Sequence, residues 1–522
     1  MNHSEGRLER EDWIAAAFLG AASLVLRIPF RSHFAYHWDS AQYALAVGEY
    51  NIRISQPQAP GYYLYVMLGR LANLLVGEPH MALVWLSVIA GAWLTAGGYL
   101  LATTMFGRRS GLGTGLILLT SPLCWFHSEI ALTNIVDSAL IVSFVFVCWR
   151  ATQRGVTWLH TVTLAALLAV VAGIRQQSAP LLIPLWGYVF WGFARPRARK
   201  FFCAAVLAVG FSLFWLIPTL KSAGGLVPYL NLLHLKSQYD APRIVWAGGG
   251  VGAILMDASC IGRACWVGLL GAAIIPLMEF IHWVVLEKAA TADGFWRANK
   301  TQLCVLGLWI APMLLFGTFM YVAQPGQVLN LFPAVAVLAS LGLVRFSERL
   351  VISQAVRTTS VLCAVLTMVA VSNAVVFMYP PHVITRLLVG LPMTGVEVRE
   401  HDAKLSACFQ AIRKNWPSEN IIVCHRLENF YWGFRQFQYH LPEYENVLLV
   451  ADTSLPGTLG AKKWIGYERR TTFQTEVPIP DGQDVLLVVP PGQSLDVFKS
   501  CFDVRKAVLV IESGAKLYQL HP

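Results

Sequence analysis

The first candidate for chemistry is a single acid that stands among aromatic and amide side chains. Asp39 lies in the segment 33–43, HFAYHWDSAQY, which follows the first hydrophobic segment of the chain. A second polar run, QPQAPGYY over residues 56–63, comes soon after it. An acid in such surroundings at a membrane surface suggests a site for an amphiphilic substrate, since acids near a membrane often carry function. The binding residues predicted in this region are Tyr43, Gln58, Tyr62 and Tyr63.

Asp39 also has a purely structural interpretation, as the cap of a helix. It precedes the helix-favouring run 40–46, and Gln42 stands at the capping-box position. The two roles are compatible, because a carboxylate at a helix start is fixed in orientation and can still act on a ligand. The tyrosines have a similar alternative as members of an interfacial aromatic belt.

A second acid, Asp137, begins another apolar helix in the run TNIVD over 133–137. It is either a helix cap or a partner of Asp39. If the two acids converge from separate outer loops, they supply a base together with a ligand for substrate or for a divalent cation. Asp39 and Asp137 are therefore also the candidate metal ligands. Glu129, which precedes this run, is predicted to be a solvated loop acid.

Arg175 stands alone between two apolar segments, on the side of the membrane where basic residues are otherwise scarce. Its planar guanidinium suits a phosphate. The alternative is an interfacial anchor whose charge reaches the headgroups. Gln327, in the run QPGQVLNLFP over 324–333, adds a further amide at an outer helix end and is a candidate for binding substrate.

The composition indicates a membrane scaffold for these residues. Of the 522 residues, 56% are hydrophobic and only 13% are charged, about half of the roughly 25% typical of soluble domains. The net charge of +10 is spread over loops between apolar segments, as topology signals are, so nucleic acid is not an expected partner. No P-loop or dinucleotide fingerprint is present, so an activated donor would have to arrive through the membrane.

The basic loops decide the predicted topology. Residues 61–77 span only about 26 Å as a helix and contain Arg70, which is marginal for a crossing. If they lie along the membrane surface, Arg108 and Arg109 join the N-terminus in the cytoplasm with the other basic loops. Eleven crossings follow, at about 13–30, 80–106, 111–126, 133–150, 157–172, 179–193, 201–218, 265–286, 303–322, 329–344 and 358–379.

An odd number of crossings places the C-terminal part outside the cytoplasm. We predict a membrane domain over 1–379, with a first outer loop at 31–79, and a soluble α/β domain over 380–522. That domain is expected to contain a helix near 396–415 and strands at 420–424, 446–450, 484–489 and 507–511. Cys260 and Cys265 face the oxidising side in this scheme and are candidates to pair, as are Cys408, Cys424 and Cys501 in the soluble domain.

Together these stretches resemble the GT-C membrane glycosyltransferases, especially the branch of protein O-mannosyltransferases and lipid A aminoarabinose transferases. The resemblance covers about residues 13–195. The stretches that carry it are Asp39 with Tyr43, the surface-helix entry PGYY at 60–63, the helix end FGRRSG at 106–111, and TNIVD at 133–137.

The resemblance implies a polytopic α-helical fold and a polyprenyl-phosphate-linked sugar as donor. Asp39 would deprotonate the acceptor for a single displacement with inversion. Asp137 would bind sugar, acceptor or a divalent ion, and Arg175 would hold the phosphate. Three positions depart from the family pattern: Ser40 follows the acid, Gln58 precedes the proline of the surface helix, and Gln327 with Asn330 replaces a late basic residue before Pro333.

Two other functions remain open from the sequence. A transporter or flippase of a lipid-linked substrate predicts paired halves and broken helices with polar groups at mid-bilayer. A non-catalytic envelope scaffold predicts that Asp39 and Asp137 are plain caps. For the enzyme, the expected location is a bacterial inner membrane with the site and the C-terminal domain on the periplasmic side, and the expected partners are membrane lipids, the lipid-linked sugar and an acceptor of unknown class.

Overall fold

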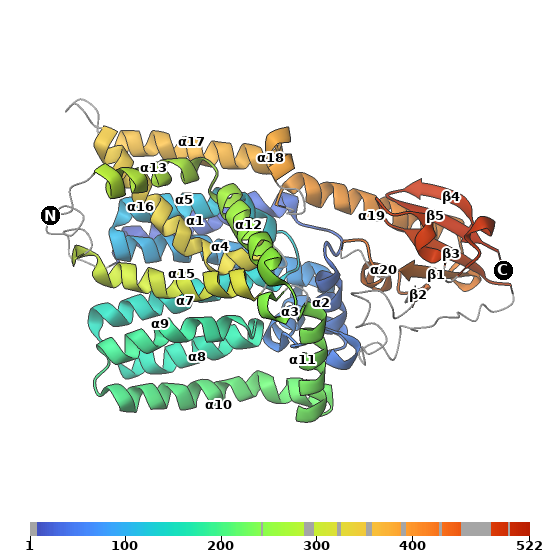
Figure 1. The fold of residues 1–522 in the computed structure, drawn as a ribbon, viewed down its shortest axis with the longest axis horizontal. Helices are drawn as coiled ribbons and strands as arrows, with labels where there is room; N and C mark the ends of the chain where they lie inside the picture. Colours follow the sequence, from blue (N-terminus) through green and yellow to red (C-terminus); the bar gives the residue numbers. More distant parts are fainter. Residues whose placement is uncertain are drawn as a thin grey trace.

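The computed structural model of the protein is largely helical. Helices run side by side in a long bundle, and a small sheet lies beyond the end of the bundle opposite the N-terminus (Figure 1). The residues that the structure describes are 8–241, 244–286, 297–320, 325–350, 358–387, 393–426, 431–449, 482–499 and 502–521.

Within these residues, seven helices are long and apolar enough to cross a membrane, as a multi-pass membrane protein requires. They are α1 (Arg10–Arg27) continued by η1 (Ile28–Phe30), α4 (Pro79–Phe106), α7 (Thr133–Arg154), α10 (Arg197–Ala223), α12 (Gly250–Leu269), α15 (Lys300–Phe319) and α17 (Thr358–Met378). The shorter helices α5 (Arg108–Thr120), α8 (Trp158–Ile174), α9 (Ser178–Phe193), α13 (Gly271–Leu286) and α16 (Phe332–Leu350) pack among them.

Two of the predicted crossings are broken in the structure. The segment 111–126 divides into α5 and the short α6 (Pro122–His127), because Ser121 precedes a proline and takes an extended conformation instead of a helical one. The segment 265–286 divides between α12 and α13 at Leu270, whose φ is 41°. The total of eleven crossings therefore stays a prediction.

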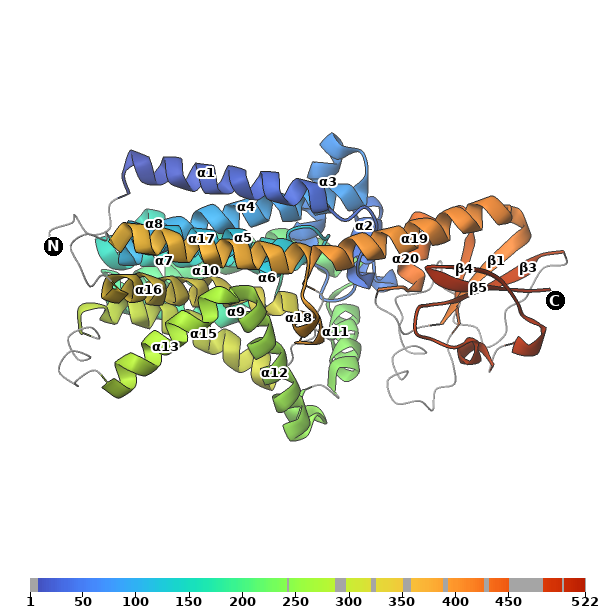
Figure 2. The same cartoon turned by 90° about the horizontal axis from the view of Figure 1, so that it is seen from above.

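Two helices near the bundle end were not predicted. α11 (Leu226–Asp240) and most of α12 fall in a region that we expected to be an outer loop. Both are inclined to the bundle in the two views (Figures 1 and 2). Trp246 between them, and Leu226 and Leu255 within them, expose apolar side chains.

The first outer loop folds into two short helices at the same end of the bundle. α2 (Trp38–Gly48) carries Asp39, and α3 (Tyr63–Val76) corresponds to the predicted surface helix. One face of α3 exposes Leu71, Leu74 and Leu75, at 63%, 81% and 92%, as a helix lying against lipid would. Its placement at a membrane surface stays a prediction.

Ion pairs at the other end support the expected course of the chain. Arg108, just after α4, pairs with Glu9 and Glu11 at 2.7 and 2.9 Å and with Asp12 at 2.7 Å. The chain therefore leaves the N-terminal end along α1 and returns to it along α4. This is the arrangement expected if α3 makes no crossing between them.

The described residues of the C-terminal part form a five-stranded mixed sheet with helices. Its strand order is β2-β1-β3-β5-β4, with β1 parallel to β2 and β3, and β5 antiparallel to β3 and β4. The predicted strands and the predicted helix are present, whereas β5 was not predicted. The bounds are α18 (His382–Leu387), α19 (Gly395–Asn415), β1 (Ile421–Arg426), α20 (Phe434–His440), β2 (Glu445–Leu449), β3 (Asp484–Val489), β4 (Val508–Ser513) and β5 (Ala515–Leu520).

The fold class is thus confirmed as a helical membrane protein with a C-terminal α/β part, while the exact domain boundaries stay predictions. The predicted pairing of Cys260 with Cys265 is wrong, because both are free thiols. Cys408 and Cys424 are also free, and Cys501 lies outside the described residues.

Candidate active site

Asp39 lies in the first turn of α2 but does not cap the helix. The cap is His37, whose Nδ1 accepts the backbone N–H of Asp39 at 3.1 Å. The carboxylate is held from the side instead, since Gln58 Nε2 donates to Asp39 Oδ1 at 2.8 Å. His37 Nδ1 lies 3.6 Å from Asp39 Oδ2, and the carboxylate side chain remains 21% exposed. The cap interpretation is wrong, and the acid is both fixed and accessible.

Arg70 holds the opposite end of the same helix. Its Nε donates to the backbone oxygen of Val47 at 2.9 Å, and its Nη2 donates to that of Ala46 at 3.3 Å. The last carbonyls of a helix lack partners within the helix and carry partial negative charge, so an arginine stabilises them. This contact explains why an arginine interrupts the apolar segment 61–77.

The loop that carries Gln58 is fixed through its backbone. Tyr229 of α11 and Gln176 both donate to the backbone oxygen of Pro60 at 3.1 Å. Gly61 has a φ of 114°, and a Cβ there would lie 2.7 Å from the hydroxyl of Tyr50, so only glycine fits. Sequence reasoning missed Gln176 and Tyr229. The position of Gln176 beside Arg175 was the one available signal.

Asp137 forms a second, buried centre one turn inside α7. Its Oδ2 accepts from Ser178 Oγ at 2.5 Å and from Asn330 Nδ2 at 3.0 Å. The side chain is fully buried, and Oδ1 has no hydrogen-bond partner among the described residues. Because the cap of α7 is Leu132, the cap interpretation is wrong for Asp137 as well. Ser178 and Asn330 were not predicted as partners.

Arg175, at the C-terminal end of α8, contacts this second centre through its backbone oxygen, which accepts the N–H of Ser178 at 3.0 Å. With the Gln177 amide oriented so that its oxygen faces the guanidinium, that oxygen accepts from Arg175 Nε at 3.0 Å and from Nη2 at 2.9 Å. The third nitrogen, Nη1, is buried without a partner in the described part of the chain. Only 6% of Arg175 is exposed, so it is not an anchor that reaches into the headgroups.

Two tyrosines link the two centres. The rings of Tyr43 and Tyr62 meet edge to face at 5.3 Å. Burial raises the pKa of Tyr62 to about 12, while the positive charge of Arg175 lowers that pKa and the negative charge of Asp39 raises it. Tyr62 therefore lies within electrostatic reach of both the acid and the arginine. Tyr63 instead packs its ring against Tyr50, 5.2 Å away.

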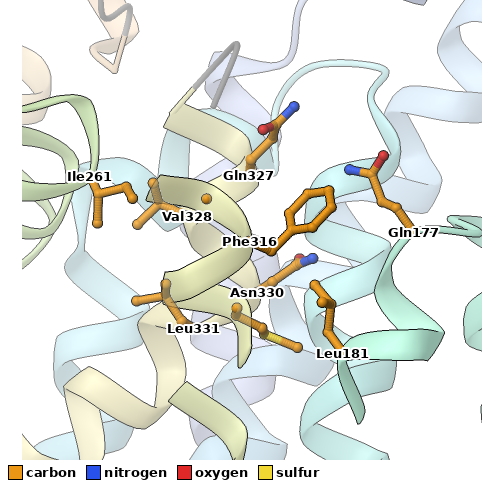
Figure 3. A pocket seen from close by; sticks show the side chains of 10 residues that line it. Gln177, Leu181, Ile261, Phe316, Gln327, Val328, Asn330 and Leu331 are labelled. Atoms are coloured by element: carbon orange, nitrogen blue, oxygen red, sulfur yellow. The ribbon is translucent and has the colours of Figure 1, made fainter. Parts of the chain in front are cut away.

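A groove opens beside the Arg175 centre, between α9, α12, α15 and η5 (Pro325–Asn330). Its volume is about 390 Å³ when the open space at its mouth is included. Figure 3 shows its side chains, of which Gln177 and Asn330 are partners of Arg175 and Asp137. Its polar residues are Gln177, Gln327 and Asn330, and its apolar residues include Leu181, Ile261, Phe316 and Leu331.

The two candidate metal ligands have different hydrogen-bond partners. Asp39 is bound by Gln58, whereas Asp137 is bound by Ser178 and Asn330. The described residues hold no group of three or more His, Cys, Asp or Glu side chains that fits a metal ion. The metal site at Asp39 and Asp137 stays a prediction, and we assign no step of the reaction to a metal.

Glu129 differs from its predicted role. It was expected to be solvated, but it is fully buried, and neither carboxylate oxygen has a hydrogen-bond partner within the described residues. It lies beside Arg27, which is also fully buried. The positive charge of Arg27 explains why Glu129 can be buried at the bundle end, because a buried acid needs an opposite charge nearby.

Comparisons with known proteins place the fold. No protein-family model and no curated protein sequence match the chain. Among solved structures, ArnT from Cupriavidus metallidurans bound to undecaprenyl phosphate matches with a TM-score of 0.57 at 12% identity, over 98% of this chain and 99% of that chain. The same protein in the apo state gives a TM-score of 0.54 at 14% identity, with the same coverage.

A weaker match is the oligosaccharyltransferase of Archaeoglobus fulgidus, with a TM-score of 0.42 at 14% identity over 78% of this chain and 58% of that chain. That similarity is too low to support an argument. The ArnT matches are sufficient for the architecture. The chain therefore has the fold of ArnT over nearly its whole length. This confirms the resemblance in fold that we predicted from the sequence.

Proposed function

We propose that the protein is a glycosyltransferase of the GT-C type. It transfers a sugar from a polyprenyl-phosphate donor to an extracytoplasmic acceptor, with inversion at the anomeric carbon. The observation that carries the proposal is the state of Arg175. Its guanidinium is buried with one unused nitrogen, and it is bound by Gln177, which lines a groove between apolar helices. Buried charged groups ordinarily have partners, so an anion is the ligand expected at this nitrogen.

The groove has the chemistry that a polyprenyl phosphate requires. The phosphate would accept from Arg175 Nη1, while Gln177 fixes the other two nitrogens of the guanidinium. The prenyl chain would follow the apolar side chains of α9, α12 and α15. ArnT, whose fold the chain shares, is bound to undecaprenyl phosphate in one of its structures, which supports the same class of donor here.

Asp39 would supply the base. The acceptor hydroxyl gives its proton to Asp39 as its oxygen forms a bond to the anomeric carbon. The bond from that carbon to the phosphate oxygen breaks, and polyprenyl phosphate leaves with the electron pair. Because the phosphate is already a good leaving group, the protein needs mainly to orient the acceptor and remove its proton. Gln58 holds the carboxylate for that task.

The proposed topology also determines the side of the membrane on which the site lies and the acceptors that can reach it. The site lies at the end of the bundle opposite the N-terminal ion pairs, so a cytoplasmic N-terminus puts it outside the cytoplasm. We propose a bacterial inner membrane, with a lipid, glycan or protein of the envelope as acceptor. Membrane lipids surround the bundle.

The test is mass spectrometry of envelope glycans and lipid-linked sugars in cells that carry the wild-type chain, Asp39→Asn, or Glu49→Gln as a matched control. Glu49 is an exposed acid at the other end of α2. We expect one glycosylated product to disappear, and its lipid-linked donor to accumulate, only with Asp39→Asn. Movement of a lipid-linked sugar across the membrane without a new glycosidic product would favour a flippase. Identical profiles in all three strains would favour a scaffold.

A further inference from the structure

Three consecutive backbone amides of the segment that leads to Asp39 are bound by the C-terminal part of the chain. Asp402 of α19 accepts the N–H of His33 at Oδ2, at 2.7 Å, and that of Phe34 at Oδ1, at 3.2 Å. His440 of α20 accepts the N–H of Ala35 at Nε2, at 3.0 Å. Because Asp402 and His440 bind the backbone of residues 33–35, they fix the path of this segment independently of its own side chains.

The protonation state of His440 allows its Nε2 to accept a hydrogen bond. Burial lowers the pKa of His440 well below its usual value of 6.5, and the nearby His80, Arg413 and His401 lower it further. The ring is therefore neutral at physiological pH and can present a bare Nε2 as an acceptor. The ring also packs against Phe34, with 5.0 Å between centroids.

Two further side chains of α20 hold other parts of the first outer loop and the start of α4. Arg435 of α20 donates from Nη2 to the backbone oxygen of Ile54 at 2.9 Å. Tyr439 accepts the N–H of His80 at 3.1 Å and donates to Glu78. The C-terminal part thus binds the loop before Asp39, after α2, and at the start of α4.

A short path connects these contacts to the carboxylate. Tyr36 packs against His401, with 4.7 Å between centroids, and His37 packs against Tyr431 at 5.5 Å. His37 in turn caps α2 through the N–H of Asp39 itself. A displacement of residues 33–35 would therefore reach the cap, and with it the orientation of the acid.

We propose that the C-terminal α/β part positions the Asp39 loop, with Asp402 and His440 as positioning residues. The predicted effect of these contacts on sugar transfer rests on the proposed function. Their predicted effect on the ordering of the Asp39 loop does not. The positioning contacts act on the segment that leads to the base, and none of them involves Arg175. Loosening them should lower the kcat for transfer and leave the KM for the lipid-linked donor nearly unchanged.

The experiment is hydrogen–deuterium exchange on the full chain in detergent, followed at the amides of residues 33–35. Asp402→Ala and His440→Leu remove the acceptors, and we expect exchange there to rise at least tenfold. His440→Gln places an amide oxygen near the position of Nε2, and we expect it to restore protection at Ala35. The matched control is Glu400→Gln, which removes an exposed ion pair with Lys404 on α19.

Each outcome separates the two proposals. Unchanged exchange at residues 33–35 in both acceptor-removing variants would overturn the positioning role, whatever the activity. If β1–β5 also exchange faster in those variants, His440→Gln decides: a folded sheet with protected Ala35 supports the role, and a folded sheet with unprotected Ala35 refutes it. Increased loop exchange without measurable transfer by the wild-type chain would support the positioning role while contradicting the proposed function.

Discussion

Arg175→Gln is the perturbation that most sharply tests the phosphate site. The substitution removes the unpartnered Nη1 and the positive charge, while glutamine retains polarity in the buried position. A hydrogen bond to a charged group contributes roughly 1.5–3 kcal/mol. Since about 1.4 kcal/mol is tenfold in affinity, we expect binding of undecaprenyl phosphate to weaken roughly 10- to 140-fold.

The assay is native mass spectrometry of the purified chain with undecaprenyl phosphate and, in parallel, with uncharged undecaprenol. Only the phosphate should lose affinity, because the prenyl chain follows the apolar side of the groove. Arg175→Lys keeps the charge without the planar fork and should fall between wild type and Arg175→Gln. Arg109→Gln is the control, since Arg109 forms an exposed pair with Glu348. Equal affinity of Arg175→Gln and wild type for the phosphate would refute the assignment.

Two predictions concern packing and pH. Gly326→Ala should lower the melting temperature by several degrees, corresponding to roughly 1–3 kcal/mol, because its Cβ would lie 1.9 Å from Asn134 Nδ2 and 2.6 Å from His127 Nε2. Gly187→Ala in α9, where a Cβ meets nothing within 4 Å, should leave the melting temperature unchanged or raise it, because alanine favours a helix more than glycine does. Equal melting of both variants would contradict the packing argument. Burial raises the pKa of Asp402 from 3.8 to about 7. The folded state therefore holds the proton more tightly, so this group's contribution to stability should fall as pH rises from about 4 to 7 and level off above it. The melting temperature of Asp402→Asn relative to wild type should rise over that range, and a constant difference would contradict the shift.

The features that could be predicted from the sequence are those that depend on local runs of residues. The apolar segments, the basic loops and the short β-rich runs identified the helical fold, the α3 helix and four of the five strands. Local patterns also singled out Asp39, which the structure holds accessible at the bundle end. The strand β5, AKLYQL, was missed because Lys516 and Gln519 interrupt its apolar residues, whereas the predicted strands contain continuous apolar runs.

The partners of each acid were not predictable, because they come from distant segments. Asn330 lies 193 residues after Asp137, and Asp402 lies 369 residues after His33. The cap of α2 was misassigned because a histidine ring nitrogen accepts the N–H of Asp39, whereas sequence patterns favour an acid or a hydroxyl there. Packing of the whole bundle also decides the burial of Glu129, and no local run of residues indicates it.

The most direct measurement of the central claim is the single-turnover rate of Asp39→Asn with the lipid-linked donor that the cellular comparison identifies. The introduced amide would keep an oxygen for Gln58, so folding and donor affinity should match wild type. Loss of the base should slow transfer roughly 10²- to 10⁴-fold, or about 2.7–5.4 kcal/mol in the barrier. Transfer by Asp39→Asn at the wild-type rate would show that Asp39 is not the base.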